Sequence, residues 1–380
     1  MKIKALQKRW TALCEIVAVL LLTAFVSACS GAIPQSRPSA EATRPYVAPP
    51  PPVERRAPQL AEGPSRELTD AIHALGSGFN GEVGIAVRDI EQGWTVSWNG
   101  ERYMPQQSVS KMWVALTVLD LVDRGQLSLN QNVTVTPADF VVFHQPMRAQ
   151  VGRNGYETTL AYLFEQAMTR SDNLANDKML WLAGGPGAVN GFLARNDLRG
   201  LRFGPGERLL QSGIAGLEWR QSLSDGNNFY TARANLPGSV RQAAMDRYHS
   251  DPIDGATAVG TVEALARLTR GELLSARSTQ IMLNAMRSSH TGPQRLRGGV
   301  PSGWAFGHKT GTGQNLNGMT AGYNDIGIVT APDGRNYAVA VLIGSTRVGI
   351  PARQQLMQAV MGQTVSHHLR RRYELLTGTN

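Results

Sequence analysis

The chain has 380 residues, which is enough for one large domain or two small ones with an ample core. With 42% hydrophobic and 18% charged residues its composition is that of a globular protein, not of a disordered or fibrous chain. The net charge of +9 is spread without long Lys/Arg runs, so it predicts a basic surface that favours anionic envelope polymers and excludes a dedicated nucleic-acid-binding protein.

The N-terminus has the features of an export signal. Basic residues within 2–9 precede an apolar run at 16–22 and then small residues. Residues 26–29, Val-Ser-Ala-Cys, resemble a bacterial lipobox. We therefore predict a lipoprotein signal peptide at 1–28 and a lipidated Cys29, which would anchor the chain to a membrane of the bacterial cell envelope with the domain facing the periplasm.

Two alternatives for this segment are a plain secretory signal cut near Ala28 and a single membrane anchor, although the apolar run is short for a spanning helix. Cys14 would leave with the signal, so Cys29 would have no partner and the exported chain no internal disulfide. Residues 29–66 include the run Pro49-Pro50-Pro51-Pro52 and show no apolar periodicity, which predicts an extended linker.

The folded domain is predicted at 67–380, beginning with a helix over 68–75 where apolar residues recur at helical spacing. Alternating segments at 83–87 and 94–98 predict a hairpin. The pattern over 111–123 is again helical, and it opens a largely helical middle of the chain.

Strands return near the C-terminus at 324–330 and 337–343, and a last helix is predicted over 352–376. Strands at both ends of a helical middle predict an α/β fold: one antiparallel sheet with an all-helical subdomain inserted into it.

Three short motifs carry the chemistry: Ser108-Val109-Ser110-Lys111, Ser171-Asp172-Asn173 and Lys309-Thr310-Gly311. A serine hydroxyl is a weak nucleophile until a base removes its proton. Ser108 and Lys111 are three residues apart on a predicted helix, so their side chains share one face. Burial and a neighbouring cation such as Lys309 both favour a neutral amine that could act as this base.

Each motif also has a simpler interpretation when taken alone. Residues 171–173 are of types that cap helices, and 309–311 could be a strand with a surface lysine followed by a turn. All three in this order instead match the motif set of class A β-lactamases and penicillin-binding proteins.

From about Glu67 to Leu376 the chain resembles a class A β-lactamase of the serine β-lactamase and penicillin-binding protein superfamily. Besides the three motifs, further stretches resemble this family: 96–100, 182–186, 271–274 and 323–326. The resemblance implies a three-layer α/β/α sandwich with an all-helical half and a site in the cleft between them.

Site roles follow from the same resemblance. It implies that Ser108 is the acylated nucleophile, that Lys111 is its base, alone or through water, and that Ser171 relays a proton to the leaving nitrogen. Asn173 would bind the amide side chain of the substrate.

The resemblance also implies that Lys309 and Thr310 bind the substrate carboxylate, a fitting role for an ammonium and a hydroxyl. Backbone N–H groups of Ser108 and Thr312 would form the oxyanion hole. Phe143 is either an aromatic residue at the cleft mouth or part of the core.

Class A members deacylate with a glutamate in the motif E-x-x-L-N. Counting without gaps from the second motif, this position falls on Glu207, where the sequence is Glu207-Arg208-Leu209-Leu210-Gln211. Gln211 therefore replaces the asparagine that helps to hold the water, and the alternative is a solvated loop carboxylate in a coincidental register.

The following segment, 212–254, is longer than the family pattern. It contains Trp219, Phe229, Tyr230 and Tyr248, so we predict that it packs on or near the cleft rim. Glu218 lies inside it and is the reserve candidate for deacylation.

Three functions stay open at this point. The first is an envelope β-lactamase, the second a D,D-peptidase-like enzyme acting on peptidoglycan stem peptides, and the third a lipid-anchored peptidoglycan-binding protein without activity. The histidines show no metal-ligand spacing and no phosphate-binding loop precedes a helix, so no metal, cofactor or nucleic acid is expected, and we expect a monomer.

Overall fold

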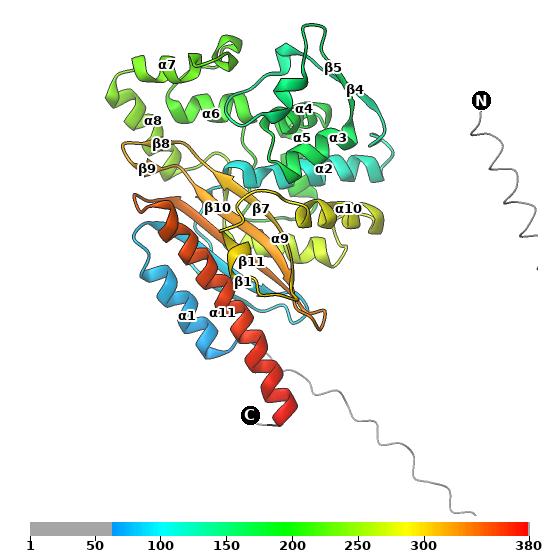
Figure 1. The fold of residues 1–380 in the computed structure, drawn as a ribbon, viewed down its shortest axis with the longest axis vertical. Helices are drawn as coiled ribbons and strands as arrows, with labels where there is room; N and C mark the ends of the chain where they lie inside the picture. The colour runs from blue at the N-terminus through cyan, green and yellow to red at the C-terminus, as the bar shows by residue number, and fades with distance from the viewer. Residues whose placement is uncertain (1–62, 379–380) are drawn as a thin grey trace, which may run out of the picture. The chain divides into compact units, whose positions relative to one another are not determined.

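The computed structural model describes residues 63–378, so the predicted signal peptide, Cys29 and nearly all of the predicted linker lie outside the described residues. The described part contains a five-stranded antiparallel sheet with the order β2-β1-β11-β10-β7 (Figure 1). Its strands are β1 (Glu82–Asp89), β2 (Thr95–Trp98), β7 (Ala305–Thr312), β10 (Tyr323–Thr330) and β11 (Asn336–Ser345). The predicted hairpin and both C-terminal strands are confirmed.

Helices cover both faces of this sheet. Helices α1 (Arg66–Ser77) and α11 (Ile350–Thr377) lie side by side on one face (Figure 1). On the other face, α9 (Ala258–Thr269) packs on β1 and β11, and α10 (Ala276–Arg287) packs on β7. Alternation along β1 explains the two layers: Ile85 joins the apolar cluster under α1 and α11, whereas Ala86 joins the cluster under α9.

The helical half is built around α2 (Lys111–Asp123), whose bounds equal the predicted ones. Every residue of α2 from Lys111 to Leu119 is buried, as expected of a helix that is apolar on all sides. The helices α3 (Leu160–Thr169), α4 (Asn173–Leu182) and α5 (Gly185–Arg195) surround it. A three-layer α/β/α sandwich with an inserted all-helical subdomain is thus confirmed.

Residues 207–250, which include most of the long segment 212–254, form α6 (Glu207–Ala215), η4 (Gln221–Ser224), α7 (Asn228–Asn235) and α8 (Gly238–Ser250). It has two small apolar clusters of its own. One joins Leu210 and Met245 to Leu316 of β8 (Asn315–Leu316), which pairs with β9 (Met319–Thr320), and the other joins Phe229 to Val142. These contacts fix the segment to both halves of the domain.

The structure also contains short strand pairs that the sequence analysis did not predict. The pairs are β3 (Met104–Pro105) with β6 (Gly255–Ala256) and β4 (Asn132–Val135) with β5 (Tyr156–Thr159). Within residues 63–378, no helix combines the length and the apolar character that crossing a bilayer requires.

Candidate active site

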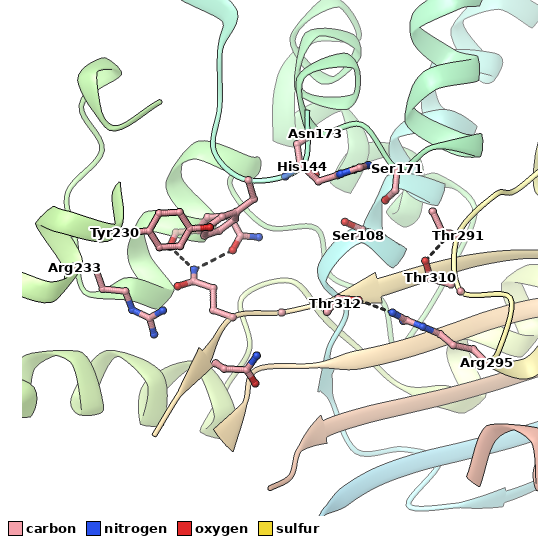
Figure 2. A pocket seen from close by; sticks show the side chains of 16 residues that line it. Ser108, His144, Ser171, Asn173, Tyr230, Arg233, Thr291, Arg295, Thr310 and Thr312 are labelled. Atoms are coloured by element: carbon pink, nitrogen blue, oxygen red, sulfur yellow. Dashed lines mark hydrogen bonds between the residues drawn. The ribbon is translucent and has the colours of Figure 1, made fainter. Parts of the chain in front are cut away.

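Ser108 lies in η1 (Gln107–Ser110), a single tight turn that runs directly into α2. Its preceding residue, Gln107, has a φ of 54°, a left-handed conformation that is uncommon outside glycine. The buried carboxylate of Asp254 holds this conformation, because it accepts hydrogen bonds from the Gln107 backbone N–H and from the Tyr248 hydroxyl, both at 2.8 Å. The turn thereby presents Ser108 to the cavity (Figure 2).

Lys111 lies at the centre of the site and contacts three other side chains. Its Nζ lies 2.8 Å from Ser108 Oγ, 2.9 Å from Asn173 Oδ1 and 2.6 Å from Glu207 Oε1. The side chain has no exposed surface, so these three acceptors replace water around the amine and match the three N–H bonds of a lysine ammonium. The predicted nucleophile, base, amide and glutamate therefore meet at one atom.

Glu207 is the first residue of α6, and one neighbour holds its backbone while another holds its carboxylate. Its backbone N–H donates to Asp177 Oδ1 at 3.0 Å, and Gln211, one helical turn later, donates from Nε2 to Glu207 Oε2 at 3.2 Å. Burial, together with the nearby Glu207 charge, raises the pKa of Asp177 to about 6. In contrast, Glu218 is exposed and is not among the described residues that line the cavity.

Ser171, in the second motif, forms a hydrogen bond with Lys309 of the third motif. Lys309 Nζ donates to Ser171 Oγ at 2.8 Å and to the Thr310 carbonyl at 2.9 Å. Burial lowers the pKa of Lys309 well below its usual value, and the charges of Lys111 and Arg295 add to this effect. The interpretation of Lys309 as a surface lysine is therefore wrong.

The second motif combines a structural role with its place in the site. Asp172 caps α4 by accepting from the Ala175 backbone N–H at 3.0 Å, as the simpler interpretation proposed. Ser171 has a φ of 60° and, like Asn173, lines the cavity. The cap therefore positions the two flanking side chains.

Glycine is required at position 311 because strand β7 packs directly on the turn of the nucleophile. A Cβ atom at Gly311 would lie 2.3 Å from the Gln106 carbonyl oxygen and 3.3 Å from the Ser108 backbone nitrogen. A side chain at this position would push the strand away from Ser108. This close approach places Thr310 and Thr312, which both line the cavity, beside the nucleophile.

The sequence analysis missed Arg295, which supports the end of β7. Its Nη2 donates to Thr312 Oγ1 at 2.6 Å and its Nη1 to the Gly311 carbonyl at 2.9 Å. Thr310 in turn lies 2.7 Å, oxygen to oxygen, from Thr291 (Figure 2). Nothing in the local sequence distinguishes Arg295 from other arginines, since its partners are distant along the chain.

A cavity of about 550 Å³ joins these groups, with Ser108, Ser171 and Asn173 in its wall. Phe143 lies at its rim, where its ring packs edge to face on Phe229 at 4.9 Å between centroids. Tyr230 and Arg233 complete this rim, so the long segment does lie at the cleft. Residues 63–378 contain no group of three or more His, Cys, Asp or Glu side chains that could hold a metal ion.

Asp254 makes the stability of the site depend on pH. Burial raises the pKa of this carboxyl to about 6, although the hydrogen bonds from Tyr248 and Gln107 oppose the shift. The folded protein thus binds the Asp254 proton more tightly than the unfolded chain does. The protonated carboxyl therefore makes its full contribution to the free energy of unfolding below about pH 4, and this contribution is lost as the pH rises through about 6.

We expect the free energy of unfolding of the wild type, relative to that of the Asp254→Asn variant, to fall by about 3 kcal/mol between about pH 4 and pH 7. Urea unfolding across this range measures the difference. Asp246→Asn, on the exposed face of α8, is the control and should track the wild type. Equal pH dependence in the Asp254→Asn variant would contradict the assignment.

Comparisons with known proteins agree with this geometry. The model of a family described as "Beta-lactamase enzyme family" matches residues 67–369. The β-lactamase VEB-1 of Pseudomonas aeruginosa is 26% identical over 302 residues, covering 80% of this chain and 90% of the relative. The extended-spectrum β-lactamase PER-1 of the same organism is 28% identical over 278 residues, covering 73% of this chain and 79% of the relative.

Solved structures show the same similarity. A β-lactamase from Chitinophaga pinensis aligns with a TM-score of 0.65 at 25% identity, covering 80% of this chain and all of that one. An ancestral class A β-lactamase aligns with a TM-score of 0.62 at 28% identity, covering 79% of this chain and 99% of that one. The resemblance to class A β-lactamases drawn from the three motifs is confirmed.

Proposed function

Because the chain belongs to the β-lactamase enzyme family, we propose that it hydrolyses β-lactams through an acyl-enzyme on Ser108, which a water activated by Glu207 releases. One observation carries this proposal: Lys111 Nζ lies within hydrogen-bond distance of both Ser108 Oγ and Glu207 Oε1. The nucleophile and the carboxylate are thereby joined through a single buried amine.

In the acylation step, Lys111 first gives a proton to Glu207 or to solvent, and the Ser108 oxygen then attacks the lactam carbonyl while its own proton passes to the neutral amine. The alternative route carries the Ser108 proton through water to Glu207. The C–N bond of the ring then breaks, and Ser171 relays the proton taken from Ser108 to the leaving nitrogen, so that its own hydroxyl is restored. Lys309 is 2.8 Å from Ser171 Oγ, so it orients this hydroxyl while it attracts the carboxylate of the substrate.

In the deacylation step, a water gives its proton to Glu207 and its oxygen attacks the ester carbonyl. The ester C–O bond then breaks, and the Ser108 oxygen takes a proton from Lys111, which Glu207 reprotonates. Gln211 supports this step, since its amide contacts Glu207 Oε2 and lines the cavity. During both steps, the backbone N–H groups of Ser108 and Thr312 would bind the developing oxyanion.

Intact-protein mass measured over time after mixing with a penicillin tests the proposal. We expect an adduct of one penicillin that decays as the ring-opened product accumulates, and no adduct on the Ser108→Ala variant. An adduct that persists through the time course would instead indicate a penicillin-binding, D,D-peptidase-like enzyme. A wild-type protein that never gains mass would favour a binding protein without activity.

A further inference from the structure

Arg233 of α7 reaches the cavity from the long segment that follows Glu207. Its Nε and Nη2 atoms are buried and have no hydrogen-bond partner among the described residues. Buried guanidinium nitrogens without acceptors are costly, and they are normally paired. Arg148, in the same region, shows the usual solution, since its Nη2 lies 3.1 Å from Asp225 Oδ1.

The surroundings of Arg233 are positive. None of the sixteen described residues that line the cavity is Asp or Glu, and two of them, Arg233 and Arg295, are arginines. The pKa of Arg233 is lowered, first by burial and then by the charge of Arg241 on α8, so a second cation is close by. This end of the cavity therefore favours an anion that the protein itself does not supply.

Arg233 lies on the side of the cavity opposite the groups proposed to bind the ring carboxylate. Figure 2 shows Tyr230 and Arg233 on one side and Thr291, Thr310 and Arg295 on the other. A ligand with its carboxylate at Thr310 thus extends past Asn173, which would bind the amide of its acyl side chain, toward Arg233. An anionic group on that side chain would then lie next to the guanidinium.

We propose that Arg233 forms an anion subsite that favours β-lactams whose acyl side chain carries a carboxylate. Because Nε and Nη2 are covered by protein atoms, Nη1 is the guanidinium nitrogen left to donate a charge-assisted hydrogen bond to such a carboxylate. The exposed ring of Tyr230, whose centroid lies 6.0 Å from that of Phe143, provides an apolar surface beside it. This inference rests on the proposed function, since it assigns the substrate class of the same cavity.

Cefixime and cefdinir test the subsite as a matched pair. They share a nucleus, and the side chain of cefixime ends in a carboxymethoxyimino group where that of cefdinir has a hydroxyimino group. In the purified full chain, we expect Arg233→Gln to lower kcat/KM about tenfold for cefixime, as loss of one charged hydrogen bond implies, mainly through KM. For cefdinir we expect a change of less than about twofold, and Arg233→Lys should fall between.

The control is Arg247→Gln, which removes the same charge from the exposed face of α8 and should leave the cefixime to cefdinir ratio unchanged. An Arg233→Gln variant that keeps the wild-type ratio while hydrolysing cefdinir normally would overturn the subsite alone. Wild-type protein that turns over neither cephalosporin would remove the proposed function and the subsite with it.

Discussion

Replacing Glu207 by glutamine should stop the reaction halfway, with an acyl adduct that forms on Ser108 and then persists. A glutamine keeps an oxygen for Lys111 Nζ, which lies 2.6 Å from the native carboxylate, so the architecture of the site is retained. It cannot accept a proton from water, and loss of a general base costs about 10²- to 10⁴-fold in rate. We therefore expect kcat to fall by about a thousandfold.

Stopped-flow hydrolysis of a chromogenic cephalosporin provides the measurement. The Glu207→Gln variant should release one equivalent of product in a burst and then stall, with the adduct visible in the intact mass. Glu218→Gln removes an exposed carboxylate from the neighbouring segment and is the control, with turnover expected at the wild-type rate. Steady turnover by Glu207→Gln would transfer the deacylating role to another group, with Glu218 tested first.

Much of this site could be predicted because its key relations are local or depend on order along the chain. Ser108 and Lys111 meet because one helical turn separates them, and apolar periodicity alone located α2. Glu207 was placed by counting from the second motif, and the structure brings it to Lys111 even though Gln211 departs from the family pattern. Here, the order and spacing of residues along the chain were sufficient.

The supporting contacts could not be predicted, since they join residues far apart in the sequence. Asp254 reaches Gln107 from almost 150 positions away, and Arg295 holds Thr312 only because β7 folds back beside it. The position of Arg233 depends on how α7 packs through Phe229 against Val142. Neither charge nor periodicity encodes such pairings, because each depends on the tertiary fold.

Replacing Lys111 by methionine should weaken both the chemistry and the fold. The thioether of methionine cannot take the Ser108 proton, so we expect the rate of acylation to fall about a thousandfold. The same change leaves Glu207 as a buried carboxylate without its cation, with only 8% of its side chain exposed. Loss of one partner from a buried ion pair costs about 3–5 kcal/mol of unfolding free energy.

A double-mutant cycle separates these two effects. Lys111→Met combined with Glu207→Gln removes both charges, so urea unfolding should show that the double variant regains most of the stability lost by Lys111→Met alone. Single-turnover acylation should remain as slow as in that single variant, because neither change restores a base near Ser108. If the single and double variants are equally unstable, the 2.6 Å contact is not an ion pair that matters to the fold. If Lys111→Met acylates at the wild-type rate, Ser108 is activated through Glu207 and water, and the amine only orients the two groups.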